Sequence, residues 1–297
     1  MDFKSELKSR AEFFEDYLST FCESEQGSIP HRLSEAMNYS LQAGGKRLRP
    51  VLCMSGAELF GMAPKKVMPM ALAFEMVHTA SLIHDDLPCM DNDTLRRGKP
   101  TSHVKFGETL ALLAGDALFL YAFDVALSGL AKQGIDAGRC NRAVNLFSKA
   151  LGPYGICGGQ VLDTDVLSQT DKQDFVYEIS SMKTMVLLRA ALCSGAILAG
   201  ASENALNALM SYGRCVGIAF QVADDVLDCV GDQAQMGKTL GKDAEQGKKT
   251  FVSSYGLDGA KNILHDLTVQ AKAFLSCFGE KAEFLCAMAD YLENRTK

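Results

Sequence analysis

The chain has 297 residues, of which 47% are hydrophobic and 22% are charged, and its formal net charge is −6. This acidic balance argues against nucleic acid as a partner, because nucleic acid is itself a polyanion. No uninterrupted apolar run approaches the roughly 18 residues of a membrane span, and segment 1–18 lacks an apolar signal core, so we expect a soluble, cytoplasmic protein. The ten cysteines are scattered without a CxxC pair, which predicts reduced thiols and no zinc site.

The predicted elements are helices throughout. Apolar residues recur with helical period along nearly every long segment, and alternating strand patterns flanked by tight turns are missing. The expected helices span residues 3–22, 30–43, 48–60, 65–87, 107–130, 138–151, 153–168, 172–199, 203–231, 258–276 and 280–293. No linker or internal repeat divides the chain, so we predict an all-α fold with one large helical bundle over residues 1–297.

The first chemically informative motif ends the helix predicted over 65–87. Residues 85–91 read DDLPCMD, and Pro88 ends or kinks the helix so that Asp91 folds back towards Asp85. His78 lies seven residues before Asp85 on the same helical face, which favours a ligand contact, although a satisfied core histidine is the simpler reading of His78 alone. Crowded carboxylates repel one another and are costly beside apolar packing, so the cluster indicates cation binding.

A second aspartate cluster, DDVLD at 224–228, lies in the helix predicted over 203–231. Gln221, Asp224 and Asp228 share one face of this helix. Mg²⁺ takes oxygen ligands and is usually held by one or two carboxylates together with substrate phosphate oxygens. An acidic, solvated helix end explains either cluster alone. The two clusters together instead predict two walls that hold a diphosphate through Mg²⁺.

Basic residues accompany both clusters. Gly44 and Gly45 precede Lys46, Arg47 and Arg49 in GGKRLRP at 44–50, and RRGKP at 96–100 follows the first cluster. Arginine binds phosphate oxygens with a planar fork and lysine as a point charge. Solvated turns also explain these runs alone, but beside a metal site they are candidate phosphate clamps. Lys238, Lys242, Lys248 and Lys249 follow the second cluster, where a lid over the diphosphate and a flexible surface loop are equally good interpretations.

Two weaker signals lie between the clusters. The segment GGQVLD at 158–163 places Gln160 and Asp163 on one helical face, and its two glycines allow close helix approach. Lys183 and Thr184 are embedded in an apolar helix, where an unpaired ammonium would be unfavourable. We therefore expect Lys183 to have an anionic partner.

In combination, these motifs resemble the trans-type isoprenyl diphosphate synthases of the polyprenyl synthetase family, particularly the short-chain group that makes farnesyl or geranylgeranyl diphosphate. The resemblance covers almost the whole chain, through GGKRLRP at 44–50, SLIHDDLPCMDNDTLRRGKPTSH at 81–103, FGE and AGDAL within 106–118, GGQVLD at 158–163, Lys183-Thr184, FQVADDVLD at 220–228 and GKTLGKD at 237–243. It implies the isoprenoid synthase fold, a helical bundle around a central cavity, and a homodimer. Thr94 departs from the family, where another acidic residue is common, and we expect little effect on metal binding.

The resemblance also implies roles for the motif residues. Mg²⁺ ions, three per site with Mn²⁺ as an alternative, would bind Asp85, Asp91 and Asp224, with Asp86 in support. The allylic diphosphate, carrying a dimethylallyl, geranyl or farnesyl group, would contact Arg96, Lys183 and Lys238. Isopentenyl diphosphate would be held by Lys46, Arg49, His78 and Arg97. The oxygens of Thr184 and Gln221 would face the allylic carbocation, and the departing diphosphate would accept the final proton.

Product length is expected to depend on the helix that carries Asp85. In relatives, an aromatic residue five positions before the first aspartate commonly stops growth at fifteen carbons. Here that position is Ala80, and its neighbour Ser81 is also small. The resemblance therefore implies geranylgeranyl diphosphate, with twenty carbons. The alternative is a farnesyl diphosphate synthase in which Phe119 or Phe123 forms the floor of the cavity.

Other functions fit the motifs less well. A terpene cyclase also uses an aspartate-rich helix and Mg²⁺, but it has no need of the second group of basic residues at 44–50 and 96–100. A non-catalytic subunit of a heteromeric synthase would be expected to lose aspartates, and both clusters are intact here.

Overall fold

The computed structural model describes residues 1–25, 27, 29–164, 173–230 and 249–295. Its longer helices are α1 (Phe3–Ser24), α2 (His31–Leu41), α3 (Leu48–Glu58), α4 (Met68–Asp85), α6 (Glu108–Lys132), α7 (Ala137–Leu151), α8 (Ile156–Thr164), α10 (Val186–Ala199), α11 (Glu203–Val230), α14 (Phe251–Phe274) and α15 (Glu283–Asn294). Shorter elements are η1 (Pro64–Lys66), α5 (Ser102–Phe106), α9 (Phe175–Ser180), η3 (Ser181–Met185) and η4 (Ser276–Ala282). The predicted all-α bundle is confirmed over the described residues.

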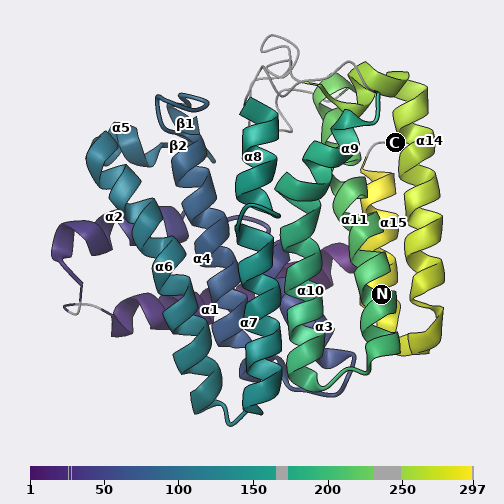
Figure 1. Ribbon diagram of the computed structural model, residues 1–297, viewed down its shortest axis with the longest axis horizontal. Coiled ribbons are helices and arrows are strands. Elements are labelled where there is room, and N and C mark those ends of the chain that lie inside the picture. The colour runs from purple at the N-terminus through teal and green to yellow at the C-terminus, as the bar shows by residue number, and fades with distance from the viewer. Residues whose placement is uncertain (26, 28, 165–172, 231–248, 296–297) are drawn as a thin grey trace.

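The core lies where the long apolar helices meet. α4 packs against α6 and α3, α10 packs against α3, α7 and α11, and α11 packs against α14. Figure 1 shows these helices running side by side, with α1 crossing behind them. The inner helices α4 and α10 are buried on most sides, and their apolar residues occur all round the helix rather than along one stripe. α4 ends at Asp85, and α10 begins directly after the turn that carries Lys183 and Thr184. The rigid core therefore positions the candidate site.

A small hairpin follows the first aspartate cluster and was not predicted from the sequence. β1 (Leu95–Arg96) pairs antiparallel with β2 (Lys99–Pro100). The two turn residues, Arg97 and Gly98, have φ angles of 53° and 74°. Two successive positive φ angles match the twist of the flanking strands and favour a tight hairpin. The strands are too short for an alternating pattern to reveal them.

Two predicted helices differ from the observed elements. The helix expected over 172–199 is interrupted by the π-helical turn η3, which carries Lys183 and Thr184. Because the following helix is apolar on most sides, an extra residue in one turn leaves no visible break in the sequence pattern, and such turns are common at functional sites. The helix expected from 258 begins at Phe251, because Thr250 caps its first turn and Gly256 (φ 72°) interrupts it without ending it.

Two helical segments, Glu108–Lys132 and Phe175–Ala199, contain 18-residue windows apolar enough to cross a membrane by composition. A window of this kind can contain one or two charged residues, so it does not have to be an uninterrupted apolar run in the sequence. The second window is 72% buried inside the chain, as a core helix would be, whereas the first is 39% buried. Core helices of folded domains commonly reach this composition, so the windows are weak evidence for a membrane span.

Candidate active site

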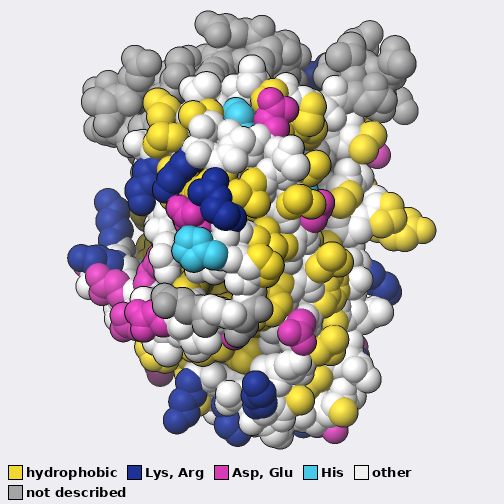
Figure 2. All heavy atoms as spheres, turned by 90° about the vertical axis from the view of Figure 1, so that its left-hand side faces the viewer, with side chains coloured by type: hydrophobic (Ala, Val, Ile, Leu, Met, Phe, Trp, Pro, Cys, Tyr) yellow, Lys and Arg dark blue, Asp and Glu magenta, His cyan; other side chains and the backbone are white. Residues whose placement is uncertain are grey.

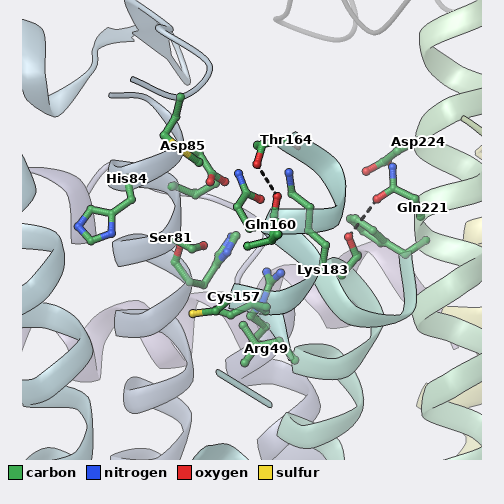
Figure 3. A pocket seen from close by; sticks show the side chains of 18 of the residues that line it. Arg49, Ser81, His84, Asp85, Cys157, Gln160, Thr164, Lys183, Gln221 and Asp224 are labelled. Carbon is green, nitrogen blue, oxygen red and sulfur yellow. Dashed lines mark hydrogen bonds between the residues drawn. The ribbon is translucent and has the colours of Figure 1, made fainter. Parts of the chain in front are cut away.

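A cavity of about 1140 Å³ lies between α4, α8, η3 and α11 (Figure 3). The predicted residues that line it are Lys46, Arg49, His78, Ser81, Asp85, Gln160, Lys183, Thr184, Gln221, Asp224 and Asp228. Asp85 and Asp224 lie on opposite walls, with Gln160 and Lys183 between them (Figure 3). Motifs that are far apart in the sequence therefore converge on one space.

The first wall is the C-terminal end of α4, where Asp85 is the last helical residue. The backbone N–H of Asp91 donates to the backbone oxygen of Asp85 at 2.9 Å, so the predicted fold-back of Asp91 is confirmed. Burial raises the pKa of the Asp85 carboxyl; the Lys183 ammonium opposes this shift, and the Asp91 carboxylate adds to it. A bound cation would relieve both the repulsion and the loss of hydration.

Asp86 has a different environment from Asp85. Its buried carboxylate accepts hydrogen bonds from Nε and Nη2 of Arg96, at 2.8 and 2.6 Å respectively. Burial raises the pKa of Asp86, and the Arg96 hydrogen bond opposes the shift. Neither residue is among those that line the main cavity. In this structure Asp86 holds the hairpin through Arg96, and the roles implied for the two residues in metal and diphosphate binding stay predictions.

The second wall is α11. Gln221, Asp224 and Asp228 all line the cavity, which confirms that they share one helical face. Asp225 is buried and accepts hydrogen bonds from Nε2 of Gln221 at 2.9 Å and from the backbone N–H of Phe251 at 2.7 Å. Asp225 therefore connects α11 to the first turn of α14.

Lys183 and Thr184 form the wall between the two clusters. Nζ of Lys183 lies 2.5 Å from Oδ2 of Asp163, so the expected anionic partner is Asp163. A Cβ atom on Gly159 would lie 2.5 Å from the backbone nitrogen of Lys183, which shows how closely α8 approaches η3. The Thr184 hydroxyl donates to Oε1 of Gln221 at 3.0 Å (Figure 3). The π-helical turn thus connects α8 and α11 across the cavity.

The basic residues near the start of α3 form a third wall. Lys46 and Arg49 line the cavity, and burial lowers the pKa of the Arg49 guanidinium to about 10. Burial also lowers the pKa of His78 well below its ordinary value, and the Arg49 and Arg97 guanidiniums lower it further. His78 is therefore neutral at pH 7. Arg97 lies outside the cavity wall, where its guanidinium donates to the backbone oxygen of Gly44.

Arg295 is a cavity residue that sequence reasoning missed. It follows α15, and its Nη2 donates to Oδ1 of Asp224 at 3.1 Å. Its Nη1 is buried and has no hydrogen-bond partner among the described residues. No motif surrounds Arg295, and Asp224 is 71 positions away in the chain. The only signal is an arginine at the end of an amphipathic helix.

The predicted chain-length residues lie at different depths. Ser81 lines the cavity, whereas Ala80 is fully buried and is not among the lining residues. Ser81 precedes Asp85 by one helical turn and shares its face, but Ala80 is rotated away from that face. Phe119 on α6 also lines the cavity. Ser81, which was predicted together with Ala80, and Phe119, the alternative floor, therefore line the cavity, and the role of Ala80 in chain length stays a prediction.

The donor set suits Mg²⁺ with substrate present. Within the described residues, no group of three or more His, Cys, Asp or Glu side chains is arranged to hold a metal ion. Mg²⁺ needs no such group, because one or two carboxylates, water and phosphate oxygens complete its octahedral shell. Asp85 and Asp224 each offer carboxylate oxygens to the cavity. Lys238, Lys242 and Lys248 lie outside the described residues.

The chain matches known proteins over nearly its whole length. The family model for polyprenyl synthetase matches residues 30–277. A dimethylallyltranstransferase of Fischerella ambigua (strain UTEX 1903) is 45% identical to this chain, over 90% of this chain and 77% of the relative. A geranylgeranyl diphosphate synthase of Cyanophora paradoxa is 41% identical, over 97% of this chain and 95% of the relative. The crystal structure of an FPP/GFPP synthase from Zymomonas mobilis superposes with a TM-score of 0.86 at 34% identity, covering 97% of this chain and 99% of that one. The chain therefore belongs to the polyprenyl synthetase family and is a short-chain prenyl diphosphate synthase.

Proposed function

We propose that this prenyltransferase condenses isopentenyl diphosphate with dimethylallyl, geranyl and farnesyl diphosphates, uses Mg²⁺, and releases geranylgeranyl diphosphate. The observation that carries the proposal is the convergence of two aspartate-bearing walls and a separate basic wall on one cavity. Two diphosphates can then bind side by side, one through metal ions and one through cationic side chains.

Each wall has a task in this reaction. Asp85, Asp91 and Asp224 would hold the metal ions, which would supply positive charge to stabilise the departing diphosphate. Lys183 lies between the two aspartate walls and adds a point charge to the same diphosphate. The Thr184 and Gln221 oxygens face the positive charge that develops on the allylic carbon.

The basic wall positions the second substrate. Lys46 and Arg49 bind the diphosphate of isopentenyl diphosphate, and neutral His78 adds a hydrogen bond. Holding this substrate beside the allylic one lets its double bond attack the cation without a bimolecular encounter. The proton of the final elimination passes to the departing diphosphate.

Incubation with isopentenyl diphosphate, dimethylallyl diphosphate and Mg²⁺, followed by chromatography of the dephosphorylated products, tests this proposal. Geranylgeraniol as the main alcohol supports it. Farnesol as the end product identifies a farnesyl diphosphate synthase instead. If no isopentenyl diphosphate is consumed even with added farnesyl diphosphate, the chain is a non-catalytic subunit or a cyclase.

Replacement of Lys46 by alanine is expected to raise the KM for isopentenyl diphosphate about tenfold or more, because a hydrogen bond to a charged group contributes about 1.5–3 kcal/mol. The KM for the allylic diphosphate should change less than about twofold in initial-rate measurements. Arg97→Ala should act in the same direction, because Arg97 supports the backbone before Lys46. Lys99→Ala is the control, since Lys99 is exposed on the same hairpin as Arg97. A rise confined to the allylic KM would show that Lys46 serves the other diphosphate.

We further propose a homodimer through α6. Four leucines of this helix, Leu112, Leu113, Leu120 and Leu127, are 46–74% exposed. Leu113, Leu120 and Leu127 recur every seven residues and so lie on one side of α6. Figure 2 shows apolar side chains gathered on one face of the molecule. Exposed apolar patches of this kind favour a protein interface over open solvent.

Leu120→Glu is expected to convert the dimer into a monomer in sedimentation-velocity runs, because the charge would be buried at the contact. Val269→Glu on α14 is the matched control, since Val269 is 54% exposed on another helix. If Leu120→Glu sediments as wild type does, α6 is not the interface.

A cytoplasmic location is proposed as well. All ten cysteines are free thiols, and five of them are buried. Unpaired thiols are typical of a reducing compartment. The proposal would be withdrawn if fractionation of the native cells placed the protein elsewhere.

A further inference from the structure

The basic segment before α3 sends its side chains in opposite directions. Lys46 and Arg49 line the cavity, whereas the side chain of Arg47 is completely buried in the interior. Arg47 has φ 49° and ψ 37°, in the left-handed region, immediately before α3 begins at Leu48. A residue other than glycine adopts this conformation only where its surroundings enforce it. The contacts that enforce this conformation of Arg47 therefore bear on the direction of Lys46 and Arg49.

The Arg47 guanidinium is held on three sides. Nε donates to Oε1 of Glu15 on α1 at 2.7 Å, and Nη2 donates to the backbone oxygen of Leu41 at the end of α2, also at 2.7 Å. Nη1 donates to Oε1 of Glu75 on α4 at 2.6 Å. One side chain thus connects three helices to the start of α3. Its planar, fixed donors make it a rigid connection.

Glu75 is more deeply buried than the other acidic partner. Its side chain is 2% exposed, against 38% for Glu15. Its charge raises the pKa of Arg49 and Arg97 against the lowering effect of burial. Oε2 of Glu75 is buried and has no hydrogen-bond partner among the described residues. The carboxylate therefore acts on the basic wall through its charge as well as through its bond to Arg47.

A buried ion pair of this kind contributes little net stability compared with apolar residues of similar volume. Arg47 lies between Lys46 and Arg49 in the chain but is buried away from the cavity, which indicates a different benefit. We propose that the Arg47–Glu75 pair is a positioning device for the isopentenyl diphosphate site: it enforces the turn that aims Lys46 and Arg49 into the cavity. Arg47 and Glu75 are positioning residues, because neither lines the cavity. The inference rests on the proposed assignment of Lys46 and Arg49 to that diphosphate.

The double variant Arg47→Met/Glu75→Leu tests the inference, because it removes both charges together. Each single replacement leaves one buried charge unpaired and should lower the Tm strongly. The double variant should regain a Tm near that of wild type. Its KM for isopentenyl diphosphate should stay about tenfold raised, while the allylic KM and kcat change less than about threefold. If the isopentenyl diphosphate KM recovers together with the Tm, the pair is only structural and the inference is wrong.

Arg47→Lys provides a second test that keeps a cation beside Glu75. Lysine cannot bind three partners in the fixed geometry of a guanidinium, so the KM for isopentenyl diphosphate should rise about fivefold or more. An unchanged KM in this variant would overturn the proposal. Glu12→Gln is the control and should leave both KM values near those of wild type, because Glu12 is exposed on α1 and is not a partner of Arg47. Failure of the proposed function shows in wild type itself, as absence of isopentenyl diphosphate turnover.

Discussion

Asp85→Ala and Asp224→Ala are each expected to lower kcat about 10³-fold or more, while the far-ultraviolet circular dichroism stays that of a helical protein. Each change removes carboxylate oxygens from one wall of the cavity. The charge stabilisation that metal ions provide is worth several kcal/mol, and each 1.36 kcal/mol corresponds to a tenfold change in rate. Stopped assays at saturating Mg²⁺ and both substrates measure the effect. Asp258→Ala, at an exposed position of α14, is the control.

The two variants should differ in stability. Burial raises the pKa of the Asp85 carboxyl in the folded protein, so folding favours its protonated form and its ionised form is destabilising at neutral pH. The penalty is absent below the unfolded-state pKa, grows as the pH rises towards the folded-state pKa and is complete above it, so Asp85→Ala should raise the Tm at pH 7. Asp224→Ala should not, because it leaves the Arg295 guanidinium without its carboxylate partner. Near wild-type turnover in either variant would contradict the two-wall site, whatever the Tm.

Those features of the site that lie within one short segment could be predicted from the sequence. Gln221, Asp224 and Asp228 follow the helical period, so their common face required no tertiary information. Pro88 implied the end of α4 and the return of Asp91, which the backbone hydrogen bond to Asp85 confirms. In both cases a short segment determines its own geometry.

Contacts between residues far apart in the chain could not be predicted from the sequence. The pairing of Arg295 with Asp224 depends on how α15 packs beside α11, and no pattern around either residue encodes it. Similarly, Arg47 reads as one cation among three, and only the fold shows that it turns inwards to Glu75. The prediction for Ala80 has a different basis. The helical period alone places Ser81 one turn before Asp85, whereas the emphasis on Ala80 came from family resemblance.

Product length depends on which residues limit the space for the prenyl chain in the cavity. Phe119 lines the cavity from α6, and its ring lies 5.6 Å from that of His84 on α4. Nearby aromatic rings add bulk to the same helices: Phe147 of α7 lies 4.9 Å from Phe74 and 5.1 Å from Phe123, between ring centroids. Ser81 is a small residue of α4 that lines the same cavity. We therefore expect Phe119 and Ser81 to limit how many five-carbon units fit.

Phe119→Ala is expected to shift the main product from geranylgeranyl diphosphate to a chain at least one isoprene unit longer, because it opens space where the prenyl chain ends. Ser81→Phe should shift it the other way, to farnesyl diphosphate, by filling that space. Ala80→Tyr should mainly lower the free energy of unfolding, by about 1–3 kcal/mol, and with it the Tm, since Ala80 is fully buried and a larger side chain overpacks its surroundings. Liquid chromatography with mass detection of the dephosphorylated products measures chain length in all three variants. If Ala80→Tyr is the variant that shortens the product and Phe119→Ala and Ser81→Phe leave it unchanged, the floor lies behind α4 rather than between α4 and α6.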